Sequence, residues 1–350
     1  MKDTFVGDLL KPKALGNPTA MRQTFAEYRW EFVIAVMLVL AAVWATTLSP
    51  YYLSLDQLLF SSRNLVFTGI MTLGLAFIIL TGEMDLSLPS ILAVCTVSLA
   101  KASQANLPLP VALAGITVIA LMMSAFNGFL VAKLRLPALP VTLGTMGAYR
   151  GVAFIIGSNV GYTGFNNTYK WLGTATVGTS PLPVMLLVLV GCVAIFWVLM
   201  HYTTFGRRCF AIGNNSAAVT YSGINVARTK IGTYMLGGLT AAMGAWIFIG
   251  QFGSSRGDNA NGVLLGMITA VVLGGVDING GRGKVLGVLL SMLFIWTLRN
   301  GMGLANIAGP IEQLIIGVLL VTGVLVSNLT TRGNWRPRTR KKVIAGPSAP

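Results

Sequence analysis

Long apolar stretches, separated by short polar connections, recur along most of the chain. A bilayer span needs about 20 mostly apolar residues. The pattern therefore predicts an all-α polytopic membrane protein with about ten transmembrane helices inside a domain over 32–329. The predicted spans are 32–53, 57–80, 86–105, 108–132, 138–158, 182–201, 231–250, 262–275, 284–300 and 310–328. The eighth is short and bounded by glycines, which favours a broken or re-entrant helix covered by protein.

Composition agrees with a membrane protein. Hydrophobic residues make up 54% of the chain, charged residues only 10%, and the mean hydropathy is +0.74, whereas soluble domains carry about 25% charged residues. The net charge of +15 does not predict nucleic-acid binding, because the cations lie in loops and tails beside apolar spans. One histidine and three scattered cysteines give no disulfide framework, no metal site and no histidine-based triad.

Lysine and arginine are unevenly distributed between the two sides that ten spans define. With the N-terminus in the cytosol, nineteen of the 25 lysines and arginines fall on the cytosolic side. This positive-inside bias predicts a multi-pass protein with both termini in the cytosol. Residues 1–31 then form one cytosolic tail, and residues 330–350 form a second, basic tail that is expected to be disordered and to contact anionic lipid.

Among the predicted outer connections, residues 158–181 form the longest and are polar and aromatic. Two interpretations stay open. The aromatic residues can form an interfacial belt at the level of the lipid headgroups, or the segment can be a platform on which another protein docks from outside. The aromatic residues in question are Tyr162, Phe165, Tyr169 and Trp171.

Residues 202–230 form the longest polar, basic interruption between apolar segments in the second half of the chain. A turn at 213–214 and an N-cap at Asn215 or Ser216 predict a short helix over 216–222. Because the rest of the domain is apolar, a capped helix outside the membrane suggests a cytosolic partner that grips it. The residues expected in this contact are Arg207, Arg208, Gly213, Asn214, Ser216, Tyr221 and Gly223, the last of which can end the helix in a left-handed cap.

Two predicted inner-face turns carry charged residues at the membrane boundary. Asp85 or Ser87 in the first turn can be a plain helix N-cap, or its acids can face a partner or a pathway. The second turn is glycine-rich but has no Walker lysine pattern, so it predicts close backbone packing and not nucleotide binding. The charged residues of the two turns are Glu83, Asp85, Asp277 and Arg282.

Arg150 lies near the middle of the fifth predicted span. An arginine there costs about 2.5–3.5 kcal/mol on insertion scales, so it is expected to face protein or water. It can line a polar path or tie loops together through buried carbonyls, and the sequence leaves both open. Asn127 in the fourth span is a second candidate for the path.

The ten acids all lie away from the span centres. Proton- and sodium-coupled carriers usually place ionisable groups there, so the pattern favours energy supplied from elsewhere over a self-contained carrier. A membrane enzyme is disfavoured as well, since no nucleophile–base pair or metal cluster is visible in the sequence.

Five short motifs occur in a fixed order between residues 50 and 330. They are Ile79-Leu80-Thr81 with Asp85-Leu86-Ser87; Asn127 to Val131; Thr142 to Thr145 with Arg150-Gly151; Phe205-Gly206-Arg207 through Gly213-Asn214 to Ser222-Gly223-Ile224; and Val271 to Gly275 with Gly280 to Gly283. Together they resemble the permease subunits of bacterial ABC importers of the ribose, rhamnose and autoinducer-2 type.

The resemblance implies the ABC importer permease fold and a place in the bacterial cytoplasmic membrane. It implies a pore for a sugar or sugar-like molecule, made with a second permease that is identical or related. An ABC ATPase would bind a coupling helix in 202–230 and hydrolyse ATP, and a sugar-binding protein would deliver cargo from outside, so this chain itself needs no cofactor. The alternative is a self-contained secondary carrier or facilitator for a polar solute.

The resemblance has one departure. Leu264-Leu265-Gly266 stands where many such permeases carry Glu-Leu-Asp, so two acids are missing. This suits one member of an unequal permease pair, or a divergent subgroup.

Overall fold

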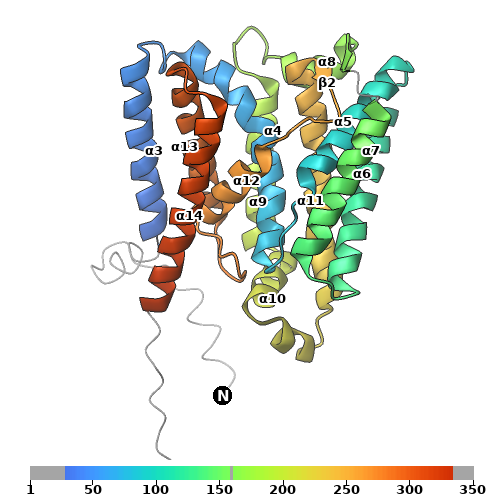
Figure 1. Cartoon of the computed structure of the whole chain (residues 1–350), viewed down its shortest axis with the longest axis vertical. Helices are drawn as coiled ribbons and strands as arrows, with labels where there is room; N and C mark the ends of the chain where they lie inside the picture. The colour runs from blue at the N-terminus through green and yellow to red at the C-terminus, as the bar shows by residue number, and fades with distance from the viewer. Residues whose placement is uncertain (1–27, 158–160, 334–350) are drawn as a thin grey trace, which may run out of the picture.

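The computed structural model of the chain describes residues 28–157 and 161–333, which contain twelve α-helices and one two-stranded sheet. Most of the predicted tails, 1–27 and 334–350, therefore lies outside the described residues. Ten of the helices coincide with the predicted spans, so the all-α polytopic prediction is confirmed (Figure 1). They are α3 (Arg29–Leu48), α4 (Leu55–Leu80), α5 (Leu88–Gln104), α6 (Leu109–Ala132), α7 (Ala138–Gly157), α9 (Val184–His201), α11 (Val226–Phe252), α12 (Val263–Leu273), α13 (Val285–Leu304) and α14 (Gly309–Gly333).

Seven helices of the described chain are long and apolar enough to cross a membrane, judged by length and composition. The eighth predicted span is a clear exception, because α12 has only 11 residues. At 1.5 Å per residue it extends roughly 16 Å, about half of the 30 Å hydrocarbon core. The prediction of a short, glycine-bounded helix is confirmed. Irregular chain over 256–262 precedes it and runs beside the helices (Figure 1).

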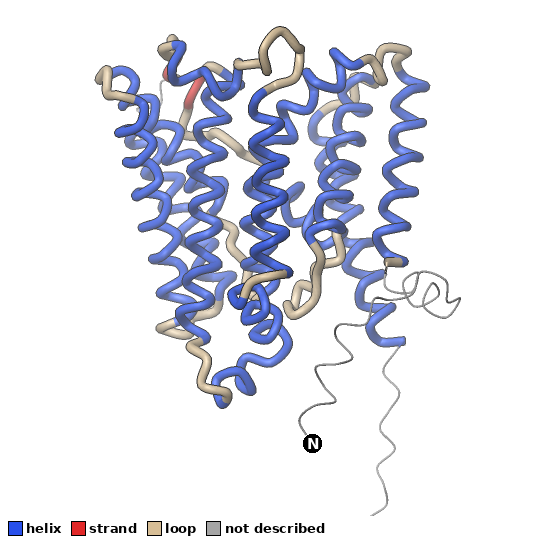
Figure 2. The backbone as a smooth tube through the Cα atoms, turned by 180° about the vertical axis from the view of Figure 1, so that it is seen from behind, coloured by secondary structure: helices blue, strands red, loops and turns tan. Residues whose placement is uncertain are grey.

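The two remaining helices lie at opposite ends of the bundle (Figure 1). At one end, α8 (Asn167–Thr174) lies close to the sheet in which β1 (Tyr162–Thr163) pairs antiparallel with β2 (Ser254–Ser255). At the other end lies α10 (Thr204–Tyr221). Seen from behind, the short strands and the α10 region again lie at opposite ends of the bundle, and almost all of the described chain is helical (Figure 2). The first residue of α3 and the last of α14 both lie at the α10 end.

Helices α4 and α11 form the centre of the bundle. In the most apolar 18-residue stretch of each helix, 83% of the residues of α4 and 61% of those of α11 are buried. The corresponding values are 22% for α6 and 11% for α7. Small residues let these helices approach closely: a Cβ atom on Gly238 would lie 2.6 Å from the carbonyl oxygen of Ala120 in α6. On Gly74 of α4 it would lie 3.0 Å from the Cα of Gly237. Gly237 and Gly238 of α11 are therefore helix-packing positions.

The described part of the 158–181 connection, residues 161–181, contains β1 and α8. Phe165 and Tyr169 are only 5% and 3% exposed, so these two side chains pack into the protein and do not face lipid headgroups. The Tyr169 hydroxyl donates to Leu107 O at 2.8 Å, and the Trp246 indole donates to Tyr169 O at 3.1 Å. These two bonds, which satisfy buried polar groups, turn the aromatic residues inward. Trp171 remains 53% exposed, and residues 158–160 lie outside the described chain.

Candidate functional site

Helix α10 is two helices joined at a kink. Asn215 has φ −162° and ψ 93°, which breaks the helix there. Its Oδ1 accepts a hydrogen bond from Ala218 N at 3.0 Å and so caps the second half. The predicted N-cap and the left-handed end at Gly223, with φ +77°, are confirmed. The predicted turn at 213–214 was wrong, because both residues are helical and the break comes one residue later.

The exposed side of α10 carries most of the residues that the sequence assigned to a partner. Tyr221, at the end of the second half, is 93% exposed, the largest value among the exposed large hydrophobic residues of the described chain. The other exposed members of the set are Arg207, Arg208, Asn214, Ser216 and Gly223. The exposed residues of α10, with Gly223 just after its end, make up what we call the accessible surface of α10.

Gly213, in contrast, packs against two other segments of backbone. A Cβ atom there would lie 2.1 Å from the nitrogen of Gly281 and 2.2 Å from the carbonyl oxygen of Leu80. Gly281 N itself donates to Leu80 O at 2.9 Å. The Asn214 amide donates to Gly281 O at 3.0 Å and to Phe210 O at 2.8 Å. The middle of α10, the last residue of α4 and the α12–α13 turn therefore interlock, and we call this contact the glycine interlock.

The α12–α13 turn holds its own shape through Asp277. The Asp277 Oδ1 accepts from Asn279 N at 2.9 Å, and Asp277 N donates to Arg282 O at 3.0 Å. Gly280 and Gly281 have φ of +84° and +77°, backbone conformations that residues other than glycine rarely adopt. The Arg282 side chain is exposed. Asp277 is thus a structural residue of the turn, and Arg282 is an exposed one.

Helix α3 fixes the same turn from the opposite side. The Trp30 indole donates to Leu273 O at 2.7 Å, and Lys284 Nζ lies 2.9 Å from Glu31 Oε1. A Cβ atom on Gly275 would lie 2.9 Å from the Trp30 ring. The turn is therefore held between α3 and α10, so its position depends on both.

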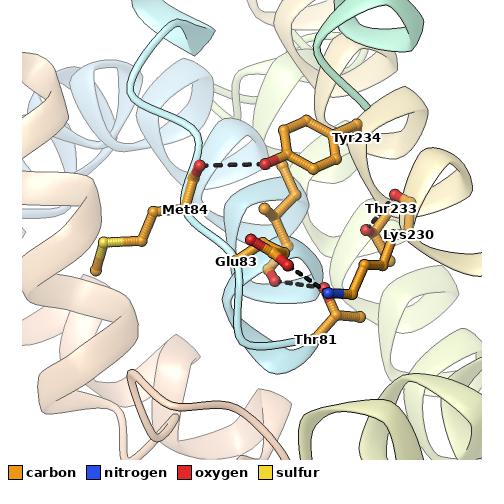
Figure 3. Close-up of polar contacts among 7 residues, drawn as sticks. Thr81, Glu83, Met84, Lys230, Thr233 and Tyr234 are labelled. Carbon is orange, nitrogen blue, oxygen red and sulfur yellow. Dashed lines mark hydrogen bonds and ion pairs between the residues drawn. The ribbon is translucent and has the colours of Figure 1, made fainter. Parts of the chain in front are cut away.

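Glu83 and the start of α11 are joined by an ion pair. Lys230 Nζ contacts Glu83 Oε1, with both side chains 16% exposed, and the Tyr234 hydroxyl donates to Met84 O at 3.3 Å (Figure 3). Gly82 has φ +78° and lies against Asn279 O of the α12–α13 turn. The α4–α5 connection is thus attached both to α11 and to the glycine interlock.

Asp85 is fully buried and lies behind this ion pair. Its Oδ1 accepts from Ser87 N at 2.8 Å and from Ser87 Oγ at 2.6 Å. The Asn127 amide donates to Ser87 Oγ at 2.8 Å, and the Tyr149 hydroxyl donates to Asn127 Oδ1 at 3.1 Å. Ser87 is the N-cap residue of α5, as one of the two predicted candidates, but it makes no side-chain cap bond; its hydroxyl bonds to Asp85 and Asn127 instead. The chain of hydrogen bonds ties the α4–α5 connection to α6 and α7.

The hydrogen-bond partners of Arg150 distinguish between the two roles that the sequence allowed. Its Nη1 donates to Gly257 O at 2.9 Å and to Asn259 O at 2.7 Å. Both carbonyls belong to the irregular segment that precedes α12. Backbone groups without helical partners must be satisfied by protein inside a membrane. Arg150 therefore acts as the tie between segments, which was one of the two roles that the sequence allowed.

Cys209 is the one cysteine outside the predicted spans, and it is fully buried on the inner side of α10. Burial raises the pKa of the Cys209 thiol to about 12. Since the thiolate is the reactive form, Cys209 is an inert packing residue.

The sequence missed the partners that organise this end of the bundle. Lys230 and Tyr234 belong to the first turns of a long apolar helix, and nothing in their spacing points to Glu83 or Met84. The repeated glycines at 280–281 were the one signal for the interlock, and they indicated only a tight turn. Both contacts join segments that are far apart in the chain, separated by 147 residues for Lys230 and Glu83.

Breaking one side of the Lys230–Glu83 pair is expected to destabilise the protein. Glu83→Gln leaves a mostly buried ammonium group without its counter-charge, which costs about 3 kcal/mol in the free energy of unfolding. Adding Lys230→Met should recover most of that loss, because the unpaired charge is removed. A double-mutant cycle measured by unfolding in mixed micelles tests this, and strictly additive effects of the two changes would contradict the ion pair.

Comparisons with known proteins agree with this architecture. Residues 57–324 match the model of the family described as "Branched-chain amino acid transport system / permease component". The chain is 33% identical over 325 residues to the autoinducer 2 import system permease protein LsrD of Photorhabdus temperata, with 91% of this chain and 98% of that protein covered. Proteins of the same name from Escherichia coli strain K12 and Shigella flexneri are 31% identical over 302 residues, with 85% and 92% covered. No solved structure matches the chain significantly.

These matches confirm the resemblance to permease subunits of ABC importers for sugar-like molecules, and they favour it over a self-contained carrier. The family is one of transport permeases, so the chain is a multi-pass membrane protein and not an enzyme. By the match over most of its length, the chain belongs to the family of permease components of branched-chain amino acid transport systems.

Proposed function

We propose that the chain forms half of the membrane pore of an ABC importer and that an ABC ATPase binds it through α10. One observation carries this proposal: α10 combines an accessible surface, with Tyr221 93% exposed, with the glycine interlock on its inner side. A partner that displaces α10 must also displace the end of α4 and the α12–α13 turn, because Gly213 leaves no free space between them.

The interlock supports a simple route from ATP hydrolysis to the pore. The ATPase would bind α10 differently in its open and closed states, and this difference in contacts would shift the permease between two conformations. The α12–α13 turn leads directly into α12 and α13, and the end of α4 leads into the α4–α5 connection. The elements that follow these turns are the ones expected to move.

The distribution of charge supports the orientation of the molecule. The α10 end carries the exposed residues Arg207, Arg208, Arg228 and Arg282, and basic residues favour the cytosolic side. Both termini would then lie in the cytosol, with ATP bound and hydrolysed on the partner ATPase. At the opposite end, the region of α8 would receive cargo from a periplasmic or secreted binding protein.

The similarity to known import permeases also bears on the cargo of this chain and on its second permease. The relatives with 31–33% identity are import permeases for autoinducer 2, which supports a sugar-like molecule as the cargo of this chain. A second permease, identical or related, would complete the pore. The absence of acids at 264 and 266 supports an unequal pair.

Tyr221→Ala tests the docking of the ATPase. An exposed aromatic residue at the centre of an interface typically contributes about 2 kcal/mol or more, which is roughly a 30-fold loss of affinity. The affinity of the purified permease in nanodiscs for its partner ABC ATPase, expected to be encoded in a neighbouring gene, can be measured by biolayer interferometry. Tyr51→Ala is the matched control, because Tyr51 is 75% exposed but lies in the connection between α3 and α4, at the end of the bundle opposite α10. Equal ATPase affinity of wild type and Tyr221→Ala would overturn the proposed contact.

A further inference from the structure

A cavity of about 410 Å³ lies where α4, α12 and α13 meet, with the last residue of α11 and the start of α14 at its edge. Its residues come from 61–72 of α4, 292–304 of α13 and the first turn of α14, so it extends from the middle of the bundle toward the end away from α10. Ligand pockets usually measure about 300–1,000 Å³. The cavity is therefore large enough for a small molecule, and neither Asn127 nor Arg150 lines it.

The charged residues of the cavity neutralise each other. Arg299 Nε of α13 lies 2.9 Å from Glu312 Oε1 of α14, and the two side chains are 31% and 25% exposed. Ionisable residues at membrane depth usually pair with one another and mark substrate pathways. No other Lys, Arg, Asp or Glu lines the cavity among the described residues. A ligand with a net charge would find no free counter-ion, which favours a neutral ligand.

The remaining polar groups offer both donors and acceptors. Asn300 Nδ2 is buried and has no hydrogen-bond partner among the described residues. Thr68 and Thr72 donate their hydroxyl protons to backbone carbonyls at 3.0 Å and 2.7 Å, so their oxygens remain acceptors. Asn64, which also lines the cavity, accepts from Gln251. A ligand hydroxyl can donate to a threonine oxygen, and it can accept from the Asn300 amide when this unpartnered, buried group turns toward the cavity. Several hydroxyl groups on one small molecule would then find hydrogen-bond partners here.

Trp296 supplies an apolar surface among these polar groups. Its indole nitrogen donates to Ser61 O at 2.9 Å, which fixes the ring against α4. An aromatic face beside hydroxyl-binding groups suits the C–H face of a sugar ring. We propose that this cavity is a binding site for a neutral polyhydroxylated molecule of sugar size on its way through the permease. This deepens the proposed function and rests on it.

A labelling experiment tests the site in the complete complex of permease pair and ATPase in nanodiscs. Ala270→Cys and, independently, Ser61→Cys place a thiol in the cavity, where a small charged methanethiosulfonate reagent can reach it. The native cysteines give little background because Cys95, Cys192 and Cys209 are buried. The probes are the neutral sugars D-ribose, L-rhamnose and D-glucose, the anion ribose 5-phosphate and the zwitterion L-leucine. At least one neutral sugar is expected to slow labelling about tenfold at saturation, and the charged probes are not.

Asn300→Leu, added to either reporter, removes the free donor. The sugar concentration for half-protection should then rise about tenfold, the effect of losing one hydrogen bond to a buried polar group. Thr297→Val is the matched control on the same helix, because Thr297 is buried outside the cavity, and it should leave the concentration unchanged.

Three results would overturn the inference: no protection by any neutral sugar, equal protection by L-leucine or ribose 5-phosphate, or no change with Asn300→Leu. The experiment is independent of the ATPase contact, because labelling needs neither ATP nor the surface of α10. Loss of protection with normal ATPase affinity refutes the cavity alone, and protection without ATPase binding refutes the proposed coupling.

Discussion

Replacing Gly213 with alanine is expected to lower the free energy of unfolding by about 3 kcal/mol or more, and to abolish transport in the molecules that still fold. The added Cβ would lie 2.1 Å from Gly281 N and 2.2 Å from Leu80 O. Both atoms belong to backbone, which cannot move aside as the tip of a flexible side chain can. Overpacking a tight contact typically costs about 1–3 kcal/mol and sometimes more, and here α10 must separate from two segments at once.

Gly191→Ala is the matched control for this substitution. Gly191 is also a helical glycine, in α9, but a Cβ atom on it would have no neighbour within 4 Å. Alanine is the better helix former, so the control should be neutral or slightly stabilising. Unfolding in mixed micelles and uptake into proteoliposomes measure the two effects. If Gly213→Ala behaved like Gly191→Ala, the glycine interlock would not exist as described.

Arg150→Met is expected to destabilise the protein by about 2–6 kcal/mol. The carbonyls of Gly257 and Asn259 would each lose a donor, and a buried group left without its partner costs about 1–3 kcal/mol. Methionine preserves the apolar stem of the side chain, so the loss reports mainly on the two hydrogen bonds. The free energy of unfolding, measured in the same micelles, is the direct readout.

Two further variants test whether the loss of stability in Arg150→Met comes from these two hydrogen bonds. Arg150→Lys keeps one donor near the carbonyls and should recover part of the loss. Arg256→Met changes an arginine beside the same segment whose contact with Asp258, at 3.3 Å, is exposed on both sides. Exposed pairs contribute about 0–1 kcal/mol, so this control should be nearly silent. Full stability of Arg150→Met, together with impaired uptake, would favour the polar path over the tie.

The hydrophobic pattern predicted ten helices, because helices inside a bilayer must be apolar, and it identified α12 as the short one. It did not predict α8, since eight residues are too few and on average too polar to form a span, although Tyr169, Leu172 and Gly173 are buried at helical spacing. In α10, the cap at Asn215 follows from local chemistry and was predicted correctly. Gly213 was mistaken for a turn residue, because its real partner is backbone that lies 68 residues further along the chain.

Residues with distant partners were the hardest to interpret. Arg150 kept two possible roles until the carbonyls 107 and 109 residues away were in place. The departure at Leu264-Leu265-Gly266 also depends on a distant residue. A Cβ atom on Gly266 would lie 3.2 Å from Arg299 Nη2, so the glycine leaves space for the guanidinium group. The counter-charge of Arg299 comes from Glu312 on another helix. Local spacing carries no information about such pairs.

The glycine interlock has a consequence for protein engineering. Permeases with different ATPase partners invite chimeras in which only the segment 204–221 is exchanged. In such a chimera, α10 from one permease would pack against Leu80 and Gly281 of the other. The contact at Gly213 is too close to accommodate a different backbone geometry. The transferable module is therefore discontinuous: α10, the corner at 80–82 and the turn at 277–284 have to be exchanged as one unit.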